Sequence, residues 1–231
     1  MSTDVGAGLD SSPSSFDGFS ARERRTATKR STVLAAATDL FLTLGYSRTT
    51  MEQVADRASV SKPTLYRFFA DKEALFAEVV FETLDRYGTP FRATLQKLSA
   101  STDVQRDLNR VARDYIAMVT QPSVVGLRRL VIGAAAQLPH VATAYYERAP
   151  DQTLRALAEA FRTLDSRGAL RVDNPSEAAA HFAMLVIGRA LDKSLFCPDR
   201  PFTAAQLRTH ARTGVEVFLA AYGPTPPDGR A

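Results

Sequence analysis

Apolar residues recur at intervals of three and four along most of the chain, whereas no segment alternates at a period of two for long enough to form a strand. The three-and-four spacing places apolar side chains on one face of an α-helix. With 231 residues, of which 45% are apolar and 23% charged, the chain can bury a core and has the composition of a folded globular protein. The sequence therefore predicts an all-α fold.

Both ends of the chain lack this spacing, and residues 1–19 and 223–231 are rich in Ser, Gly, Pro and Asp. This composition is typical of disordered tails. The start of the chain has no signal-peptide pattern, and the apolar run 182–188 is too short to cross a membrane. The single cysteine, Cys197, cannot form an internal disulfide. These features predict a cytoplasmic protein with no membrane partner.

Capping signals predict three helices between residues 20 and 72. In each, a Ser or Thr side chain can accept a hydrogen bond from a backbone amide of the first turn. The pairs are Ser20 with Glu23, Thr50 with Gln53, and Ser61 with Pro63, whose missing amide costs little in a first turn. Gly45 follows the first helix where a residue with positive φ is expected, and residues 58–61 can form a tight turn.

The third of these helices has an apolar inner face and a polar outer face. Leu65 and Phe69, four residues apart, are expected to point inward. Two short helices joined by a tight turn form a helix-turn-helix, whose second helix enters the major groove of double-stranded DNA. Residues at helix starts can in addition bind phosphate. The predicted DNA-binding residues are Thr50, Ser61, Lys62, Pro63, Thr64, Tyr66, Arg67 and Lys72.

This region, over residues 28–80, resembles the DNA-binding domain of the tetracycline-repressor (TetR) family. The matching segments are Val33 to Leu44, Gly45-Tyr46, Thr49-Thr50, Val54-Ala55, Val60 to Phe69 and Asp71 to Leu75. Ser59 departs from the pattern, because the family usually has Gly there. The resemblance implies that Tyr66 and Lys72 contact operator phosphates, as Thr50 can, and that base readout falls mainly to Lys62, Pro63 and Thr64.

Beyond residue 80 the chain resembles the TetR subgroup with an AefR-like C-terminal domain, through Leu127 to Val131 and Tyr145 to Arg148. The resemblance implies an all-helical domain for ligand binding and dimerisation. We therefore expect two domains, a helix-turn-helix domain over residues 20–72 and a helical bundle over residues 73–222.

The helices of the predicted bundle are set by apolar spacing and capping signals. They fall at 103–120, 124–138 and 151–167, with a short piece after Pro139 and two long final helices that follow Asn174 and Thr203. The middle helices hold aromatic and methionine side chains, and their low net charge favours a small apolar or amphipathic effector over a sugar phosphate or a metal ion. The predicted pocket residues are Tyr115, Met118, Leu130, Tyr145 and His181.

The last two helices predict a homodimer. Apolar residues on the final helix recur at intervals of four, four, three and four, a stripe that can pack against a partner. The helix before it is apolar on nearly every side over residues 178–191, so it is expected to face both its own core and the second subunit. The predicted interface residues are Phe182, Val186, Leu207, Ala211, Val215, Phe218 and Tyr222.

The sequence contains no motif for catalysis, nucleotide binding or metal binding, and its three histidines lack metal-ligand spacing. We therefore predict no catalytic residue, cofactor or metal. The leading interpretation is a ligand-responsive, homodimeric repressor that binds a near-palindromic operator. The alternatives are an enzyme or small-molecule carrier built on a helical bundle, and an architectural DNA-binding protein without an effector. Basic residues between 22 and 30 fit either phosphate contact or a solubilising helix start.

Overall fold

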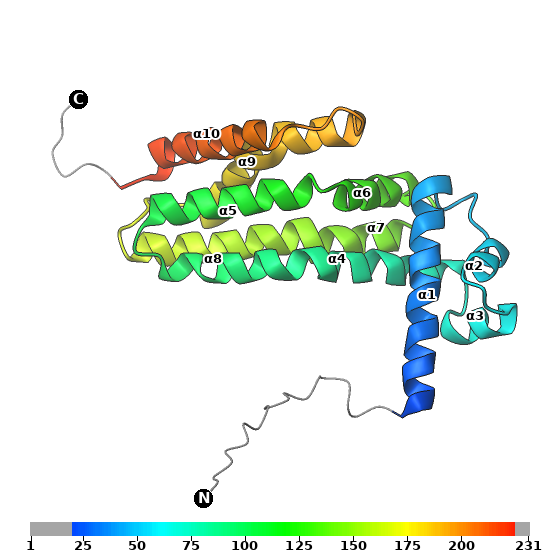
Figure 1. Cartoon of the computed structure of the whole chain (residues 1–231). Coiled ribbons are helices and arrows are strands. Elements are labelled where there is room, and N and C mark those ends of the chain that lie inside the picture. Colours follow the sequence, from blue (N-terminus) through cyan, green and yellow to red (C-terminus); the bar gives the residue numbers. More distant parts are fainter. Residues whose placement is uncertain (1–19, 225–231) are drawn as a thin grey trace, which may run out of the picture.

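The computed structural model describes residues 20–224, which form helices and no strand (Figure 1). The helices are α1 (Ala21–Leu44), α2 (Met51–Arg57), α3 (Lys62–Phe68), α4 (Lys72–Gln96), α5 (Val104–Val119), α6 (Pro122–Ala134), α7 (Pro139–Tyr146), α8 (Gln152–Ser166), α9 (Pro175–Phe196) and α10 (Ala204–Tyr222), with the short elements η1 (Leu98–Ala100) and η2 (Glu147–Asp151). The prediction of an all-α fold is confirmed. The predicted tail 1–19 and all but the first two residues of the predicted tail 223–231 lie outside the described residues.

The predicted caps set the helix starts. The Ser20 hydroxyl accepts a hydrogen bond from the Glu23 amide at 3.3 Å, and the Glu23 carboxylate accepts one from the Ser20 amide at 2.7 Å. Thr50 with Gln53 opens α2 in the same reciprocal way, at 3.2 and 2.8 Å. Such caps satisfy amides that have no partner within the helix, so a helix begins at a defined residue.

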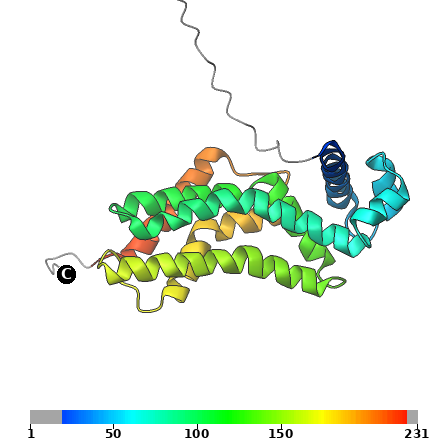
Figure 2. The ribbon, with the colours of Figure 1, turned by 90° about the horizontal axis from the view of Figure 1, so that it is seen from below.

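Two segments differ from the sequence prediction. The helix predicted to end at residue 138 ends at Ala134, and a turn leads to α7. The helix predicted to begin at residue 151 is instead continuous with α7 through the π-helical turn η2, which contains Pro150 (Figure 2). Proline lacks the amide that an α-helix needs at that position, and the wider π turn accommodates the defect without ending the helix.

Two clusters of buried side chains hold the molecule together. The N-terminal cluster combines α1, α2, α3 and the first half of α4 with α6 and α7, and includes Phe41, Leu65 and Leu130. The bundle cluster combines the second half of α4 with α5, α8, α9 and α10, and includes Phe161 and Phe218. Because α6 and α7 pack with the first three helices, burial of apolar surface crosses the domain boundary predicted at residue 72.

The long helix α4 connects these clusters. It begins beside α3 and runs the length of the molecule beside α8, while α1 crosses its start at a steep angle (Figure 1). Its first half contributes Leu75 and Phe76 to the N-terminal cluster, and its second half contributes Phe91 and Leu95 to the bundle cluster. A displacement of α4 in one cluster therefore also moves α4 residues that are buried in the other cluster.

Candidate DNA-binding surface and effector cavity

The turn between α2 and α3 places the two helices of the helix-turn-helix. Ser59 has a φ of 53° and is the only non-glycine residue with positive φ among residues 20–224. The turn is closed by the Val60 amide, which donates to the Ala55 carbonyl at 3.0 Å. Leu65 is fully buried and Phe69 nearly so, as predicted, so the opposite side of α3 faces outward. Serine thus adopts here the left-handed conformation for which the TetR pattern has glycine.

The outward side of α3 carries the predicted DNA-binding residues. Lys62, Pro63, Tyr66 and Arg67 are exposed, whereas Thr64 is half-buried. The Thr64 hydroxyl lies 2.8 Å from the Ser61 hydroxyl, so these two side chains cap α3 together. Tyr66, with 47% of its surface exposed, is an aromatic side chain presented to solvent on this face.

Lys62 is held by the preceding helix. Its ammonium donates to the Glu52 carboxylate at 3.1 Å. Backbone hydrogen bonding at Glu52 and the Lys62 ammonium lower the pKa of this carboxyl, which keeps it ionised. The pair orients Lys62 on the surface, and DNA must compete with Glu52 for its charge.

Lys72 has a structural role that the sequence did not reveal. Its ammonium donates to the carbonyl oxygens of Tyr46 at 3.0 Å and Thr49 at 3.1 Å, and lies 4.3 Å from the centre of the Tyr46 ring. An ammonium has three donors, so one remains for a phosphate. Lys72 thereby fixes the loop before α2, where Thr50 is exposed as the helix cap.

The start of α1 adds positive charge to the same end of the molecule. It extends past α3 (Figure 1), and Arg22, Arg25 and Lys29 are exposed there. Arg30 is anchored instead, because it pairs with Glu78 at 2.6 Å and lies over the Phe69 ring. These arginines and lysines were not in the predicted DNA-binding set, although their exposed positions suit phosphate contact.

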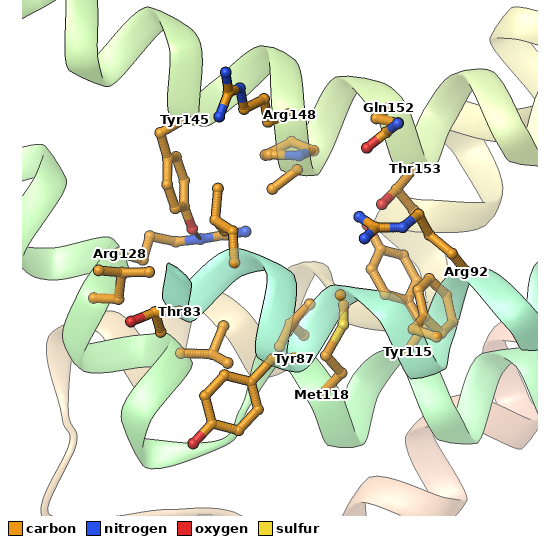
Figure 3. A pocket seen from close by; sticks show the side chains of 18 residues that line it. Thr83, Tyr87, Arg92, Tyr115, Met118, Arg128, Tyr145, Arg148, Gln152 and Thr153 are labelled. Atoms are coloured by element: carbon orange, nitrogen blue, oxygen red, sulfur yellow. Dashed lines mark hydrogen bonds between the residues drawn. The ribbon is translucent and has the colours of Figure 1, made fainter. Parts of the chain in front are cut away.

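A cavity of about 50 Å³ lies between α4, α5, α6 and the α7–η2–α8 segment (Figure 3). It lies where the two clusters meet, since Leu127 and Tyr145 belong to the N-terminal cluster and Phe91 and Tyr115 to the bundle cluster. Its lining comprises Thr83, Leu84, Tyr87, Gly88, Phe91, Arg92, Tyr115, Met118, Val119, Val124, Leu127, Arg128, Tyr145, Arg148, Ala149, Pro150, Gln152 and Thr153.

Three of the five predicted pocket residues, Tyr115, Met118 and Tyr145, line this cavity. The other two lie elsewhere, which corrects the prediction. Leu130 is buried on the face of α6 that packs in the N-terminal cluster. His181 is exposed on α9, where its Nδ1 atom lies 2.6 Å from the Tyr222 hydroxyl.

The charge of the cavity also differs from the prediction. Arg92, Arg128 and Arg148 line it, and its lining contains no Asp or Glu. The expectation of low net charge was wrong because these arginines come from α4, α6 and η2, and only the fold brings them together. Burial raises the pKa of Tyr115 to about 12, so this side chain is neutral beside them at physiological pH.

Most of the predicted dimer residues cannot contact a partner. Phe182, Val186, Ala211, Val215 and Phe218 are fully buried within their own chain. The rings of Phe161, Phe182 and Phe218 lie 5.0 to 5.6 Å apart in the bundle cluster, so the apolar stripe of α10 faces inward. Leu207 and Tyr222 are partly buried at its edge. The exposed apolar side chains of these helices are instead Met184, Leu185, Phe196 and Val217.

The described residues contain no group of three or more His, Cys, Asp and Glu side chains that could hold a metal ion. Within the same range, no helix is both long and apolar enough to span a bilayer.

Together, a capped helix-turn-helix and an appended helical bundle with an internal cavity define a DNA-binding regulator. Residues 33–79 match the family described as bacterial regulatory proteins, tetR family. Residues 106–224, just over half of the chain, match the AefR-like transcriptional repressor C-terminal domain. The chain belongs to the TetR family of transcriptional regulators, as the sequence predicted, and the matching families are regulators of transcription, not enzymes.

Similar proteins extend this result. A protein of Mesorhizobium loti described as a TetR-family transcriptional regulator is 34% identical, with a TM-score of 0.79 over 86% of this chain and 98% of that chain. The flavonoid-responsive regulator FrrA is 29% identical, with a TM-score of 0.67 over 87% of this chain and all of that chain. The HTH-type transcriptional regulator RutR of Escherichia coli is 37% identical over 97 residues, which are 41% of this chain and 46% of RutR. The chain thus spans about half the length of the curated relatives it matches.

Proposed function

We propose that this protein is a homodimeric repressor that acts in the bacterial cytoplasm, binds a near-palindromic operator through α3, and releases it when a small molecule occupies the cavity. The observation that carries the proposal is the outer face of α3, where Lys62, Tyr66 and Arg67 are exposed beside the exposed cap Thr50. A helix start with exposed polar and basic side chains on a capped support fits the major groove.

The dimer proposed here uses α9 and α10 through their outer faces. Met184, Leu185 and Val217 are 61%, 39% and 49% exposed, although α9 and α10 already pack closely against each other. Exposed apolar side chains on two adjacent helices favour burial against a second copy. In such a dimer the two α3 helices must lie about 34 to 36 Å apart to enter successive major grooves.

Release of DNA follows from the position of the cavity. A small-molecule site usually has a volume of about 300 to 1,000 Å³, so the cavity of about 50 Å³ is too narrow for such a ligand. A ligand must therefore widen it by moving α4 or the α7–η2–α8 segment, and α4 carries that movement to the helix-turn-helix. Ligand binding and operator binding are thermodynamically linked. Operator DNA must therefore weaken ligand binding by the same factor by which the ligand weakens operator binding.

A gel-shift assay with the DNA upstream of the protein's own gene tests this proposal. We expect a retarded complex with sequence preference, which a carrier or an enzyme would not give and an architectural protein would give on any DNA. Lys62→Ala is expected to relax base preference, whereas Lys72→Ala is expected to weaken binding to operator and random DNA alike. Absence of any specific complex would refute the proposal.

A further inference from the structure

Two of the three arginines that line the cavity have no carboxylate partner among residues 20–224. Within residues 20–224, neither Arg128 nor Arg148 forms an ion pair with a carboxylate. The third arginine, Arg92, has its guanidinium nitrogen 3.9 Å from a carboxylate oxygen of Asp85. The Asp85 side chain is 79% exposed to solvent. Arg92 thus has a distant, solvent-exposed carboxylate partner, whereas the charges of Arg128 and Arg148 have none among the described residues.

The guanidinium groups are held in place by neutral partners. The Nε atom of Arg128 donates to the Tyr145 hydroxyl at 3.2 Å, and the Arg148 guanidinium lies 4.1 Å from the centre of the Phe81 ring. Figure 3 shows the Arg92 and Arg128 side chains extending toward the middle of the cavity from opposite sides. These contacts leave most N–H donors of the guanidinium groups free for another acceptor.

Much of the remaining lining is apolar or aromatic, and Thr83, Gln152 and Thr153 are its polar members. Phe91 and Tyr115 stack with ring centres 4.9 Å apart and planes inclined by 15°, and Met118 lies beside them in the lining. A flat apolar body fits against these stacked rings.

We infer that the effector is an amphipathic organic anion. Its carboxylate, or a group of the same charge and shape, is bound by Arg128 and Arg148, and its apolar body lies along Phe91, Tyr115 and Met118. This inference rests on the proposed function only in calling the ligand an effector. Arginine pairs with carboxylates through two parallel hydrogen bonds, while a neutral or cationic ligand would leave the two charges unpaired next to an apolar body.

Isothermal titration of the full-length protein with 2-naphthoate and 2-naphthamide tests the inference, because the two compounds share shape and differ in charge. We expect 2-naphthoate to bind about tenfold more tightly or better. Arg128→Gln and Arg148→Gln are each expected to remove most of this preference while 2-naphthamide affinity changes less than about twofold. Arg155→Gln is the matched control, since Arg155 pairs with Asp151 one turn away and does not line the cavity.

Three results would overturn the inference: equal affinity for the two compounds, a preference that survives both substitutions, or binding of neither compound. Circular dichroism of each variant separates lost folding from lost charge, and Arg148, which is exposed, gives a second variant if Arg128→Gln unfolds. A gel shift on ligand-free protein keeps the two proposals apart. Operator binding without 2-naphthoate preference refutes only the anion, and 2-naphthoate preference without operator binding refutes only the regulator.

Discussion

Three basic side chains at the DNA-binding end are paired within the protein, whereas two arginines of the cavity have only neutral partners. At the DNA-binding end Lys62 pairs with Glu52, Arg30 with Glu78, and Lys72 with two carbonyl oxygens. In the cavity Arg128 and Arg148 have only neutral partners. DNA is a polyanion that binds from solvent. The basic side chains of this surface can therefore keep their intramolecular partners until DNA phosphates replace them. Arg128 and Arg148 lie beside apolar side chains without a carboxylate partner among the described residues, so a ligand that supplies negative charge is favoured there.

The two regions also differ in how they are held together, and the largest expected effect tests this. Phe41 is fully buried in the N-terminal cluster, against the edge of Phe76 at 5.2 Å. Phe41→Ala is expected to lower the free energy of unfolding by about 3 to 5 kcal/mol, measured by urea denaturation. Hydrogen exchange should then speed up in α6 and α7 as well as in α1–α4, because all pack in one cluster.

Phe161→Ala, in the bundle cluster, is the matched variant. It should speed exchange mainly in α5, α8, α9 and α10. If Phe41→Ala leaves α6 and α7 fully protected from hydrogen exchange, the N-terminal cluster does not unfold as one cooperative unit. The predicted domain boundary at residue 72 would then separate two independently packed parts.

The second effect concerns the contact of α9 with α10, which has no counterpart at the DNA-binding end. A Cβ atom added at Gly214 would lie 2.8 Å from the Leu185 carbonyl oxygen and 3.0 Å from its carbon. Gly214→Ala therefore pushes the two helices apart and is expected to cost about 1 to 3 kcal/mol of stability and to weaken the dimer. Thermal unfolding and light scattering measure the two effects.

Gly133→Ala is the control for that substitution. A Cβ atom there meets nothing within 4 Å, and Gly133 lies in the last turn of α6. Alanine is the better helix former by about 1 kcal/mol, so this variant should be more stable than the parent. Equal destabilisation by both substitutions would show that close approach of α9 and α10 does not matter.

The third effect is a gain in stability at the DNA-binding end. Ser59 holds a φ of 53°, which strains a residue with a Cβ atom, and glycine adopts it freely. Ser59→Gly is expected to stabilise the protein by up to about 1 kcal/mol, because the relieved strain is partly offset by the greater freedom of glycine in the unfolded chain. Ser59→Val should destabilise it. A lower melting temperature for Ser59→Gly than for the parent would contradict this account of the turn.

Much of the fold was predictable because its signals are local. Ser20, Thr50 and Thr203 each cap a helix with a residue three positions later, and all three caps are present in the structure. The apolar pair Leu65 and Phe69 likewise fixes which side of α3 is buried. The DNA-binding residues lie within one short stretch, so a pattern along the chain was sufficient to propose them.

The cavity and the dimer surface could not be predicted in the same way. Arg92, Arg128 and Arg148 are far apart in sequence, and only the packing of α4, α6 and η2 brings them to one cavity. For α9, apolar residues on several faces did not reveal which face its own core takes, so Phe182 was expected to lie toward a partner although it is fully buried. Such choices depend on tertiary packing, which leaves no local signal.

The smallest expected effect on stability at neutral pH is that of Tyr115→Phe. The comparison here is between Tyr115 in the cavity and Tyr46 at the DNA-binding end. Burial raises the pKa of Tyr115 to about 12. Burial, together with the nearby Glu73 and Asp71, also raises the pKa of Tyr46 at the DNA-binding end. In the unfolded chain a tyrosine ionises near pH 10, so between about pH 10 and 12 the folded state retains a proton that the unfolded state has lost. Stability is therefore unaffected below about pH 10 and falls as the pH rises toward 12.

Tyr115→Phe should change stability little at pH 7 and make this fall shallower, as measured by urea denaturation at pH 7, 10 and 11. An unchanged slope in Tyr115→Phe would show that Tyr115 does not carry the alkaline instability, and Tyr46→Phe would then be the variant to compare.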